Sequence, residues 1–167
     1  NLEEDTAVDN NNNNDNNNMI HWAIIGLGDV CTIKSGPAFY KCHGSTLSAV
    51  MRRTPNAAKQ WITNNTSSLP KEVAKSIRGY DTIEDMIHTE LSCSSRRLDA
   101  IYIATPPSAH LENIREIIQA LDTLPITTTS NNNNNNDKSS SIIKAIYVEK
   151  PCGRCAWETR AIVEELK

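Results

Sequence analysis

Aromatic residues, basic charge and long apolar runs are all scarce in this sequence. Phenylalanine occurs once, and aromatic residues make up 5% of the 167 positions. The 17 lysine and arginine residues are outnumbered by 20 aspartate and glutamate residues, and they form no basic stripe of the kind that binds nucleic acid. No apolar run approaches the roughly 20 residues that span a bilayer, and the acidic N-terminus is unlike a signal peptide. We therefore expect a soluble, cytoplasmic protein with neither nucleic acid nor a membrane among its partners.

The sequence also lacks the even cysteine count of a disulfide framework. It has five cysteines and no secretory signal, which favours reduced thiols over disulfide bonds. The first residue is Asn1 rather than methionine. We interpret the chain as a fragment, a processed product or an incomplete gene model, with Met19 as a candidate start of the folded part.

Two asparagine runs divide the chain. Residues 10–18 and 131–136 are almost wholly asparagine, and they account for much of the low apolar fraction of 38%. Segments without apolar side chains cannot bury a core. We predict a disordered tail over residues 1–18 and one folded domain over residues 19–167. Within that domain, residues 122–141 are predicted to be a disordered loop insertion, because loops tolerate added length.

Between the asparagine runs, short apolar runs alternate with helical patterns. This alternation is typical of βαβ units and predicts an α/β protein with a Rossmann-type, doubly wound parallel sheet. The strands are predicted over residues 20–25, 45–51, 78–80, 99–104 and 142–148. The first helix is predicted to begin near Asp29 and to break at Gly36-Pro37. The second is predicted to follow a Thr54-Pro55 cap and to end before a loop over 63–70. Further helices are predicted to begin at Lys71, at an Asp81/Glu84 capping box, at Ser108 and at Ala156.

A glycine-rich turn follows the first predicted strand. Gly26, Gly28 and Cys31 occupy the three positions of a G-x-G-x-x-G pattern, with Cys31 in place of the third glycine. The first glycine permits a tight turn, the second lets a pyrophosphate approach the backbone, and the N-terminus of the next helix offers amide donors. The third position requires only a small side chain. The strand–turn–helix context favours a dinucleotide site over an ordinary glycine turn.

The end of the second predicted strand indicates which dinucleotide binds. Folds that select NAD usually place a carboxylate about 20 residues after the glycines, where it binds the ribose 2′-hydroxyl. Here the strand ends in Arg52 and Arg53. Two guanidinium groups can hold a 2′-phosphate through charge-assisted hydrogen bonds. We infer NADP as the cofactor, with NAD as the alternative; two solvated surface arginines would be the purely structural interpretation.

Polar residues also follow the fourth and fifth predicted strands. Thr105, Pro106 and His110 come after the fourth strand, and Glu149 and Lys150 come after the fifth. The carboxyl ends of parallel strands share one edge, where open α/β sheets bind ligands. A partly desolvated lysine there can exchange a proton with a substrate hydroxyl during hydride transfer. On residue type alone, however, a lysine at a strand end and a histidine early in a helix are more often surface residues.

Five stretches of the sequence resemble one known family. They are GLGDVCTIKSGPAF (26–39), AVMRR (49–53), YDTIEDMI (80–87), DAIYIATPPSAH (99–110) and YVEKP (147–151). Together they resemble the N-terminal domain of the glucose-fructose oxidoreductase/inositol dehydrogenase (Gfo/Idh/MocA) family. The E-K-P signature and the A-T-P-P-x-x-H stretch are much more specific than the glycine motif. Apart from the insertion, the resemblance covers nearly all of residues 19–167.

The resemblance implies a role at the cofactor for each candidate residue. Gly26 and Gly28 would line the pyrophosphate with Leu27, Asp29 and Val30 beside it, Arg52 and Arg53 would stand by the adenosine ribose, and Thr105, Pro106 and His110 would flank the nicotinamide. Glu149 would contact the nicotinamide ribose or carboxamide. Lys150 would be the catalytic lysine that positions or protonates the substrate. We predict no metal site.

Members of this family oxidise or reduce a carbon of a sugar, a polyol or a related cyclic alcohol. They carry a second α/β domain that supplies substrate contacts, a catalytic histidine or aspartate, and usually the oligomer interface. This sequence ends at Lys167 without that domain. We therefore expect the fragment to bind a dinucleotide but to turn over little or no substrate, with the sugar or polyol substrate and any oligomer belonging to a full-length protein.

Two other functions remain open from the sequence. A non-catalytic dinucleotide-binding or regulatory protein would keep this domain and lose the chemistry. Cys152 and Cys155 form a C-x-x-C pattern at the start of a predicted helix, where a thiol can be activated for redox chemistry. A zinc site would need two further ligands, for which Cys42 and His43 are the only other candidate pair.

Overall fold

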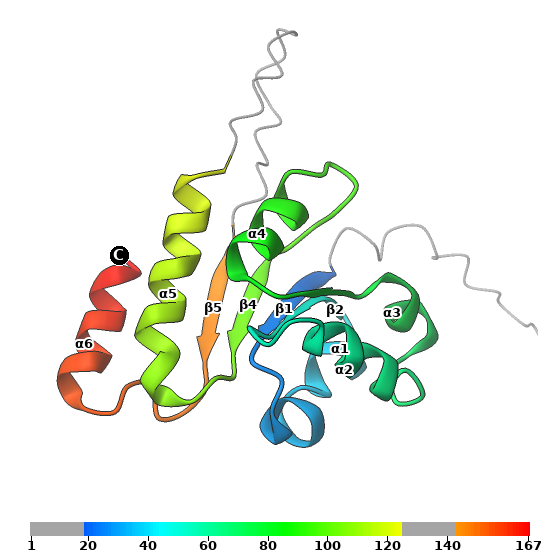
Figure 1. Ribbon diagram of the computed structural model, residues 1–167, viewed down its shortest axis with the longest axis horizontal. Coiled ribbons are helices and arrows are strands. Elements are labelled where there is room, and N and C mark those ends of the chain that lie inside the picture. The colour runs from blue at the N-terminus through cyan, green and yellow to red at the C-terminus, as the bar shows by residue number, and fades with distance from the viewer. Residues whose placement is uncertain (1–18, 125–142) are drawn as a thin grey trace, which may run out of the picture.

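A five-stranded parallel sheet lies at the centre of the structure (Figure 1), a computed structural model that describes residues 19–124 and 143–167. Its strands are β1 (Ile20–Ile25), β2 (Ser45–Met51), β3 (Arg78–Tyr80), β4 (Ala100–Ile103) and β5 (Ala145–Val148). Their spatial order is β3-β2-β1-β4-β5, and every neighbouring pair is parallel. After β1 the chain forms β2 and β3 on one side of that strand, and it then crosses over to form β4 and β5 on the other side. This reversal of direction creates a crevice at the carboxyl ends of β1 and β4.

Helices cover both faces of the sheet (Figure 1). A π-helical segment, η2 (Val30–Lys34), and the helices α1 (Ala38–Lys41), α2 (Ala57–Asn65) and α3 (Lys71–Ser76) contribute to the apolar core on one face. The helices α4 (Ile83–Leu91), α5 (Pro107–Asp122) and α6 (Ala156–Glu165) contribute to the core on the other face. This doubly wound arrangement confirms the predicted fold class. No helix in the described part of the chain combines the length and the apolar character needed to cross a membrane.

The continuous apolar runs of the central strands follow from this two-sided covering. Successive strand residues point to opposite faces, so a strand covered on both sides is apolar throughout. In β1, Ala23 and Ile25 belong to the core shared with α4, α5 and α6, whereas Ile24 belongs to the core shared with α1, α2 and α3. All three side chains are fully buried. At the edge of the sheet, by contrast, Tyr147 in β5 is 48% exposed.

The structure confirms the first three predicted strands at both ends, and it shortens the other two. The strand predicted over 99–104 spans Ala100–Ile103, and the strand predicted over 142–148 spans Ala145–Val148. The predicted disordered tail over 1–18 lies outside the described residues. So does the insertion predicted over 122–141, except for its first three residues, and the first of these still belongs to α5.

Three predicted helix starts were wrong, two of them because a distant side chain took a local hydrogen bond. The helix expected after Thr54-Pro55 begins at Ala57, since Asn56 adopts a positive φ of 61° and its N–H donates to the Asp81 carboxylate at 2.9 Å. Asp81 is therefore occupied, and Thr82 caps α4 instead, accepting from the Asp85 N–H at 3.1 Å. The helix expected from Ser108 begins one residue earlier, at Pro107. Residues 63–65, predicted as loop, complete α2.

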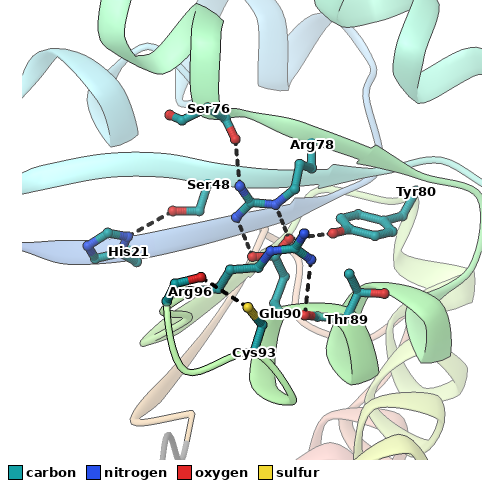
Figure 2. A network of polar contacts seen from close by, with 10 residues as sticks. His21, Ser48, Ser76, Arg78, Tyr80, Thr89, Glu90, Cys93 and Arg96 are labelled. Atoms are coloured by element: carbon teal, nitrogen blue, oxygen red, sulfur yellow. Dashed lines mark hydrogen bonds and ion pairs between the residues drawn. The ribbon is translucent and has the colours of Figure 1, made fainter.

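A buried ionic cluster holds β3 against α4 (Figure 2). Glu90 of α4 has no exposed surface, and its carboxylate accepts from Arg78 Nε and Nη2 at 2.5 Å each and from the Tyr80 hydroxyl. Arg78 also donates to the Ser76 carbonyl at 2.7 Å. Burial and the hydrogen bond to Glu90 raise the pKa of Tyr80 to about 12. We call Arg78, Tyr80 and Glu90 the Glu90 cluster; it is a structural feature, because its members satisfy one another.

Candidate functional site

A cavity of about 540 Å³ opens at the carboxyl edge of the sheet. Its walls come from the ends of β1, β2, β4 and β5 and the segments that follow them, together with Pro107 and Asn113 of α5. This is the edge at which open α/β sheets bind ligands. The lining residues are Ile25, Gly26, Leu27, Gly28, Val30, Met51, Arg52, Arg53, Thr54, Ala104, Thr105, Pro106, Pro107, Asn113, Glu149 and Lys150.

The two glycines of the turn after β1 are required for different reasons. Gly26 has a φ of +94°, and a Cβ added there would lie 2.8 Å from Thr105 Cγ2 and 2.9 Å from the Thr105 backbone nitrogen. Only glycine avoids both the strained φ and the collision. Gly28, in contrast, is exposed, and a Cβ there would meet nothing within 4 Å. Gly26 therefore sets the path of the chain, while Gly28 leaves the backbone open to an approaching ligand.

The segment after this turn has the predicted helical start near Asp29 and the predicted break at Gly36-Pro37, but its first part is a π-helix. The five-residue η2 begins at Val30 and is followed by Gly36-Pro37 and the short α1. In η2 the Ser35 N–H donates to the Val30 carbonyl at 2.9 Å, which is the wide π-type bond. A Cβ on Gly36 would collide with the Cys31 carbonyl, so the chain turns closely back on η2 there. A ligand at the turn would thus meet loop amides rather than the end of a long helix.

Cys31, in the third position of the glycine pattern, is a packing residue. It is 1% exposed and belongs to the core around Leu27, Phe39 and Tyr102. Burial raises the pKa of its thiol to about 12. A neutral thiol inside an apolar core fills space without taking part in chemistry.

The two arginines after β2 both line the cavity. Arg52 and Arg53 are exposed, and the Arg52 N–H donates to the Tyr80 carbonyl at 3.1 Å. Arg53 Nη1 lies 3.5 Å from Glu112 Oε2 on α5, and both side chains are more than half exposed. An ion pair between exposed side chains contributes little, about 0 to 1 kcal/mol. The guanidinium of Arg53 can therefore exchange this carboxylate for another anion.

His110 joins two of the loops at the cavity without lining it. The side chain has no exposed surface. Its Nε2 lies 2.7 Å from the Thr105 carbonyl, and its Nδ1 lies 2.8 Å from the Cys152 carbonyl. His110 thus ties the segment after β4 to the turn after β5. Asp29 does not line the cavity either, whereas the other candidate residues from the sequence do.

Glu149 is held in place by a buried tyrosine. Its N–H donates to the Ile103 carbonyl at 2.9 Å, which continues the pairing of β5 with β4. Its carboxylate accepts from the hydroxyl of Tyr102, a fully buried side chain. That hydrogen bond lowers the pKa of Glu149, and burial followed by the same bond raises the pKa of Tyr102. Glu149 therefore presents an ionised, oriented carboxylate beside the exposed Lys150, which precedes a cis peptide bond to Pro151.

Sequence reasoning missed Tyr102 and Asn113. Tyr102 stands in the middle of an apolar strand, so its periodicity indicates only core. Asn113 is fully buried, and its Nδ2 donates to Thr105 Oγ1 at 2.7 Å. A signal was present for Asn113, because it interrupts the apolar stripe of α5 beside Ile114 and Ile117, where a polar residue is costly unless it has a partner.

The two cysteines of the C-x-x-C pattern do not form part of this cavity. Cys155 is exposed and precedes α6, and Cys152 packs partly against the core shared with α4, α5 and α6. Among residues 19–124 and 143–167, no three histidine, cysteine, aspartate or glutamate side chains are grouped so that they could hold a metal ion.

Comparison with known proteins identifies relatives of this chain. The family model described as "Oxidoreductase family, NAD-binding Rossmann fold" (GFO_IDH_MocA) matches residues 20–123. A curated relative, Oxidoreductase P35 of Formosa agariphila, is 32% identical over 153 residues, which cover 89% of this chain and 35% of that protein. The chain thus spans about a third of the length of the curated relative it matches.

Solved structures share the fold. Apo scyllo-inositol dehydrogenase from Lactobacillus casei has 17% identity and a TM-score of 0.55, over 89% of this chain and 33% of that one. KijD10, a 3-ketoreductase from Actinomadura kijaniata in complex with NADP and TDP-benzene, has 16% identity and a TM-score of 0.58, over 89% and 34%. The super-repressor mutant of Gal80p from Saccharomyces cerevisiae has 16% identity and a TM-score of 0.57, over 89% and 32%. The chain belongs to the Gfo/Idh/MocA family of oxidoreductases, in which it matches the NAD-binding Rossmann domain.

Proposed function

We propose that this chain is the cofactor-binding part of an enzyme that transfers a hydride between NADP and a sugar, a polyol or a related cyclic alcohol. The observation that carries the proposal is the cavity itself, which collects the glycine turn, two arginines and the Glu149–Lys150 pair at one edge of the sheet. At about 540 Å³ it has the size of a small-molecule site.

The arrangement of the lining residues fits an extended dinucleotide. Gly28 offers exposed backbone for the pyrophosphate. Arg52 and Arg53, which follow β2, would bind the adenosine ribose and its 2′-phosphate. Thr105 and Pro106, with Glu149 and Lys150, follow β4 and β5 on the other side of β1, so they would surround the nicotinamide half. In this proposal His110 acts at the nicotinamide side indirectly, by fixing the Thr105 and Cys152 carbonyls.

The chain's own residues would then orient the reactants and move one proton. A bound nicotinamide supplies the acceptor or donor of the hydride. The ionised Glu149, oriented by Tyr102, would accept a hydrogen bond from the cofactor's ribose or carboxamide. Lys150 would hold the substrate oxygen, take the hydroxyl proton when the alcohol is oxidised and return a proton when the carbonyl is reduced. Because the chain spans only about a third of its curated relative, we expect these 167 residues to bind cofactor with little or no turnover.

Fluorescence titration of the chain with NADPH and with NADH tests the proposal. We expect tighter binding of NADPH. Replacing Arg52 and Arg53 by glutamine is expected to weaken NADPH binding about 10- to 100-fold, since each hydrogen bond to a charged group contributes roughly 1.5–3 kcal/mol, while NADH binding changes little. Arg160→Gln, on the exposed surface of α6, is the matched control. Tighter binding of NADH, or an equal loss for both cofactors, would contradict the NADP assignment; binding of neither would contradict the function.

A further inference from the structure

A carboxylate on α5 already occupies one of the two arginines of the cavity. Arg53 follows β2 and lines the cavity, and its Nη1 lies 3.5 Å from Oε2 of Glu112. Glu112 belongs to α5, which follows β4. Because β1 lies between β2 and β4 in the sheet, this ion pair joins the segments on the two sides of the glycine turn that follows β1. Both side chains are more than half exposed, so a ligand can reach either charge.

The residues around Glu112 place its carboxylate beside the cavity. Asn113, the next residue along α5, lines the cavity. One helical turn further on, burial followed by the negative charge of Glu112 raises the pKa of Glu116, while the charge of Arg53 opposes that shift. Arg53 is therefore near two carboxylates of the same helix. An anion that enters the cavity to bind Arg53 must compete with the one that is paired to it.

This competition distinguishes the two nicotinamide dinucleotides. NADP carries a 2′-phosphate on its adenosine ribose, where NAD has a hydroxyl. The phosphate can form charge-assisted hydrogen bonds with a guanidinium group, but at Arg53 it must first displace Glu112. A ribose hydroxyl requires no such exchange, so Arg53 can keep its partner when NAD binds. The ion pair therefore opposes the binding of NADP and leaves the binding of NAD unaffected.

We propose that Glu112 is a specificity-determining residue, which competes with the 2′-phosphate for Arg53 and so sets the margin by which this site prefers NADP over NAD. The inference rests on the proposed function, because it assumes that the adenosine end of a dinucleotide binds beside Arg53. It goes beyond that function by naming a residue that opposes the preference conferred by the two arginines.

Calorimetric titration of Glu112→Gln with NADPH and with NADH tests the inference. The affinity for NADPH is expected to rise about 2- to 5-fold, the contribution of one exposed ion pair, and the affinity for NADH is expected to stay the same. Glu164→Gln is the matched control. Glu164 is also an exposed carboxylate in an exposed ion pair, 2.6 Å from Lys167 Nζ, and it does not line the cavity. This control changes the net charge equally and should change neither affinity.

The double variant Arg53→Gln/Glu112→Gln separates competition from direct repulsion. Compared with Arg53→Gln alone, it should bind NADPH with the same affinity, because no guanidinium group remains for Glu112 to occupy. A gain as large as the one that Glu112→Gln gives in the wild-type background would mean that Glu112 repels the phosphate directly. That result would overturn the proposed competition.

The remaining outcomes also decide the question. Unchanged NADPH affinity in Glu112→Gln, or an equal gain for both dinucleotides, would overturn the inference. So would a loss of NADH affinity, which would make Glu112 a binding residue for the ribose hydroxyls. Tighter binding of NADH than of NADPH by the wild type would contradict the NADP assignment alone, because the role of Glu112 is judged by the change that its variant causes. Binding of neither dinucleotide would refute the proposed function, and this inference with it.

Discussion

The Glu90 cluster and the cavity edge are both built from polar side chains, yet their hydrogen bonds are distributed in opposite ways. In the Glu90 cluster a fully buried carboxylate receives donors from Arg78 and Tyr80, so the group is complete within the protein (Figure 2). At the cavity, Asn113 Oδ1 lacks a partner and Lys150 is exposed. A completed cluster contributes to stability, whereas an exposed side chain at the cavity, such as Lys150, is available to a ligand. Variants at the two places should therefore affect different measurements.

The largest effect is expected on stability, from Arg78→Met. This change leaves the buried Glu90 carboxylate with only the Tyr80 hydroxyl, and breaking a buried ion pair on one side costs about 3–5 kcal/mol of unfolding free energy. Urea unfolding followed by circular dichroism measures it. The double variant Arg78→Met/Glu90→Leu should recover most of the loss, because no unpaired charge remains buried. If the double variant were as unstable as the single one, the charge argument would be wrong.

The next effect distinguishes the two glycines of the cavity. Gly26→Ala should lower the unfolding free energy by about 1–3 kcal/mol, because the new methyl group combines a strained φ with a collision at Thr105. Dinucleotide affinity should also fall, since the loop after β4 must move. Gly28→Ala meets open space, so it should leave the urea midpoint unchanged and weaken binding alone. Equal stability losses in the two variants would remove the distinction between shaping the chain and admitting the ligand.

A smaller effect is expected from Tyr102→Phe, which removes the hydroxyl that orients Glu149. Cofactor affinity should fall about 3-fold, the contribution of a single hydrogen bond. The pKa of Glu149, lowered mainly by this bond, should rise toward its usual value of 4.5. Binding should then weaken at a higher pH on acidification than in the wild type. Tyr147→Phe, which alters an exposed residue stacked on Tyr102, is the control. Identical pH profiles for Tyr102→Phe and the wild type would contradict this role.

The smallest effect concerns His21, whose Nδ1 lies 2.9 Å from the Ser48 hydroxyl (Figure 2). Burial lowers the pKa of His21 below 6.5, although Asp99 opposes that shift. The unfolded chain therefore takes up a proton more readily than the folded one, and stability should decline as the pH falls through 6.5. His21→Gln should flatten this dependence, measured by urea unfolding between about pH 7.5 and pH 5. Ser48→Ala, which removes the hydroxyl 2.9 Å from His21 Nδ1, keeps the titrating group and should retain the slope.

Much of the fold could be predicted because strands covered on both faces have a simple pattern. β1, β2 and β3 begin and end at the residues predicted for them. Helix starts were less predictable, because they depend on which distant group takes each N–H. The Asn56 N–H bonds to Asp81, a residue 25 positions away, and this single contact displaced both the α2 start and the expected cap of α4.

Some residues of the candidate site could likewise be predicted from the sequence, and others could not. Residues that follow strands, such as Gly28, Arg53 and Lys150, were predictable from the rule that parallel strands share a carboxyl edge, and the structure places them around one cavity. His110, which was predicted to flank the nicotinamide, lies behind the cavity wall, where it contacts two carbonyls. Tyr102 and Asn113 act through side chains buried inside a strand and a helix. Their importance lies in one hydrogen bond each, which a pattern of apolar positions does not contain.

The buried thiol of Cys31 makes the glycine turn observable in solution. A neutral thiol at 1% exposure reacts with an alkylating reagent only while the surrounding segment is open, whereas Cys42 and Cys155 lie on the surface and react from the start. The slow labelling rate of Cys31 therefore measures how often the segment beside Gly28 opens. Any molecule that binds at that turn should lower this rate, whether or not the chain can carry out a reaction on it.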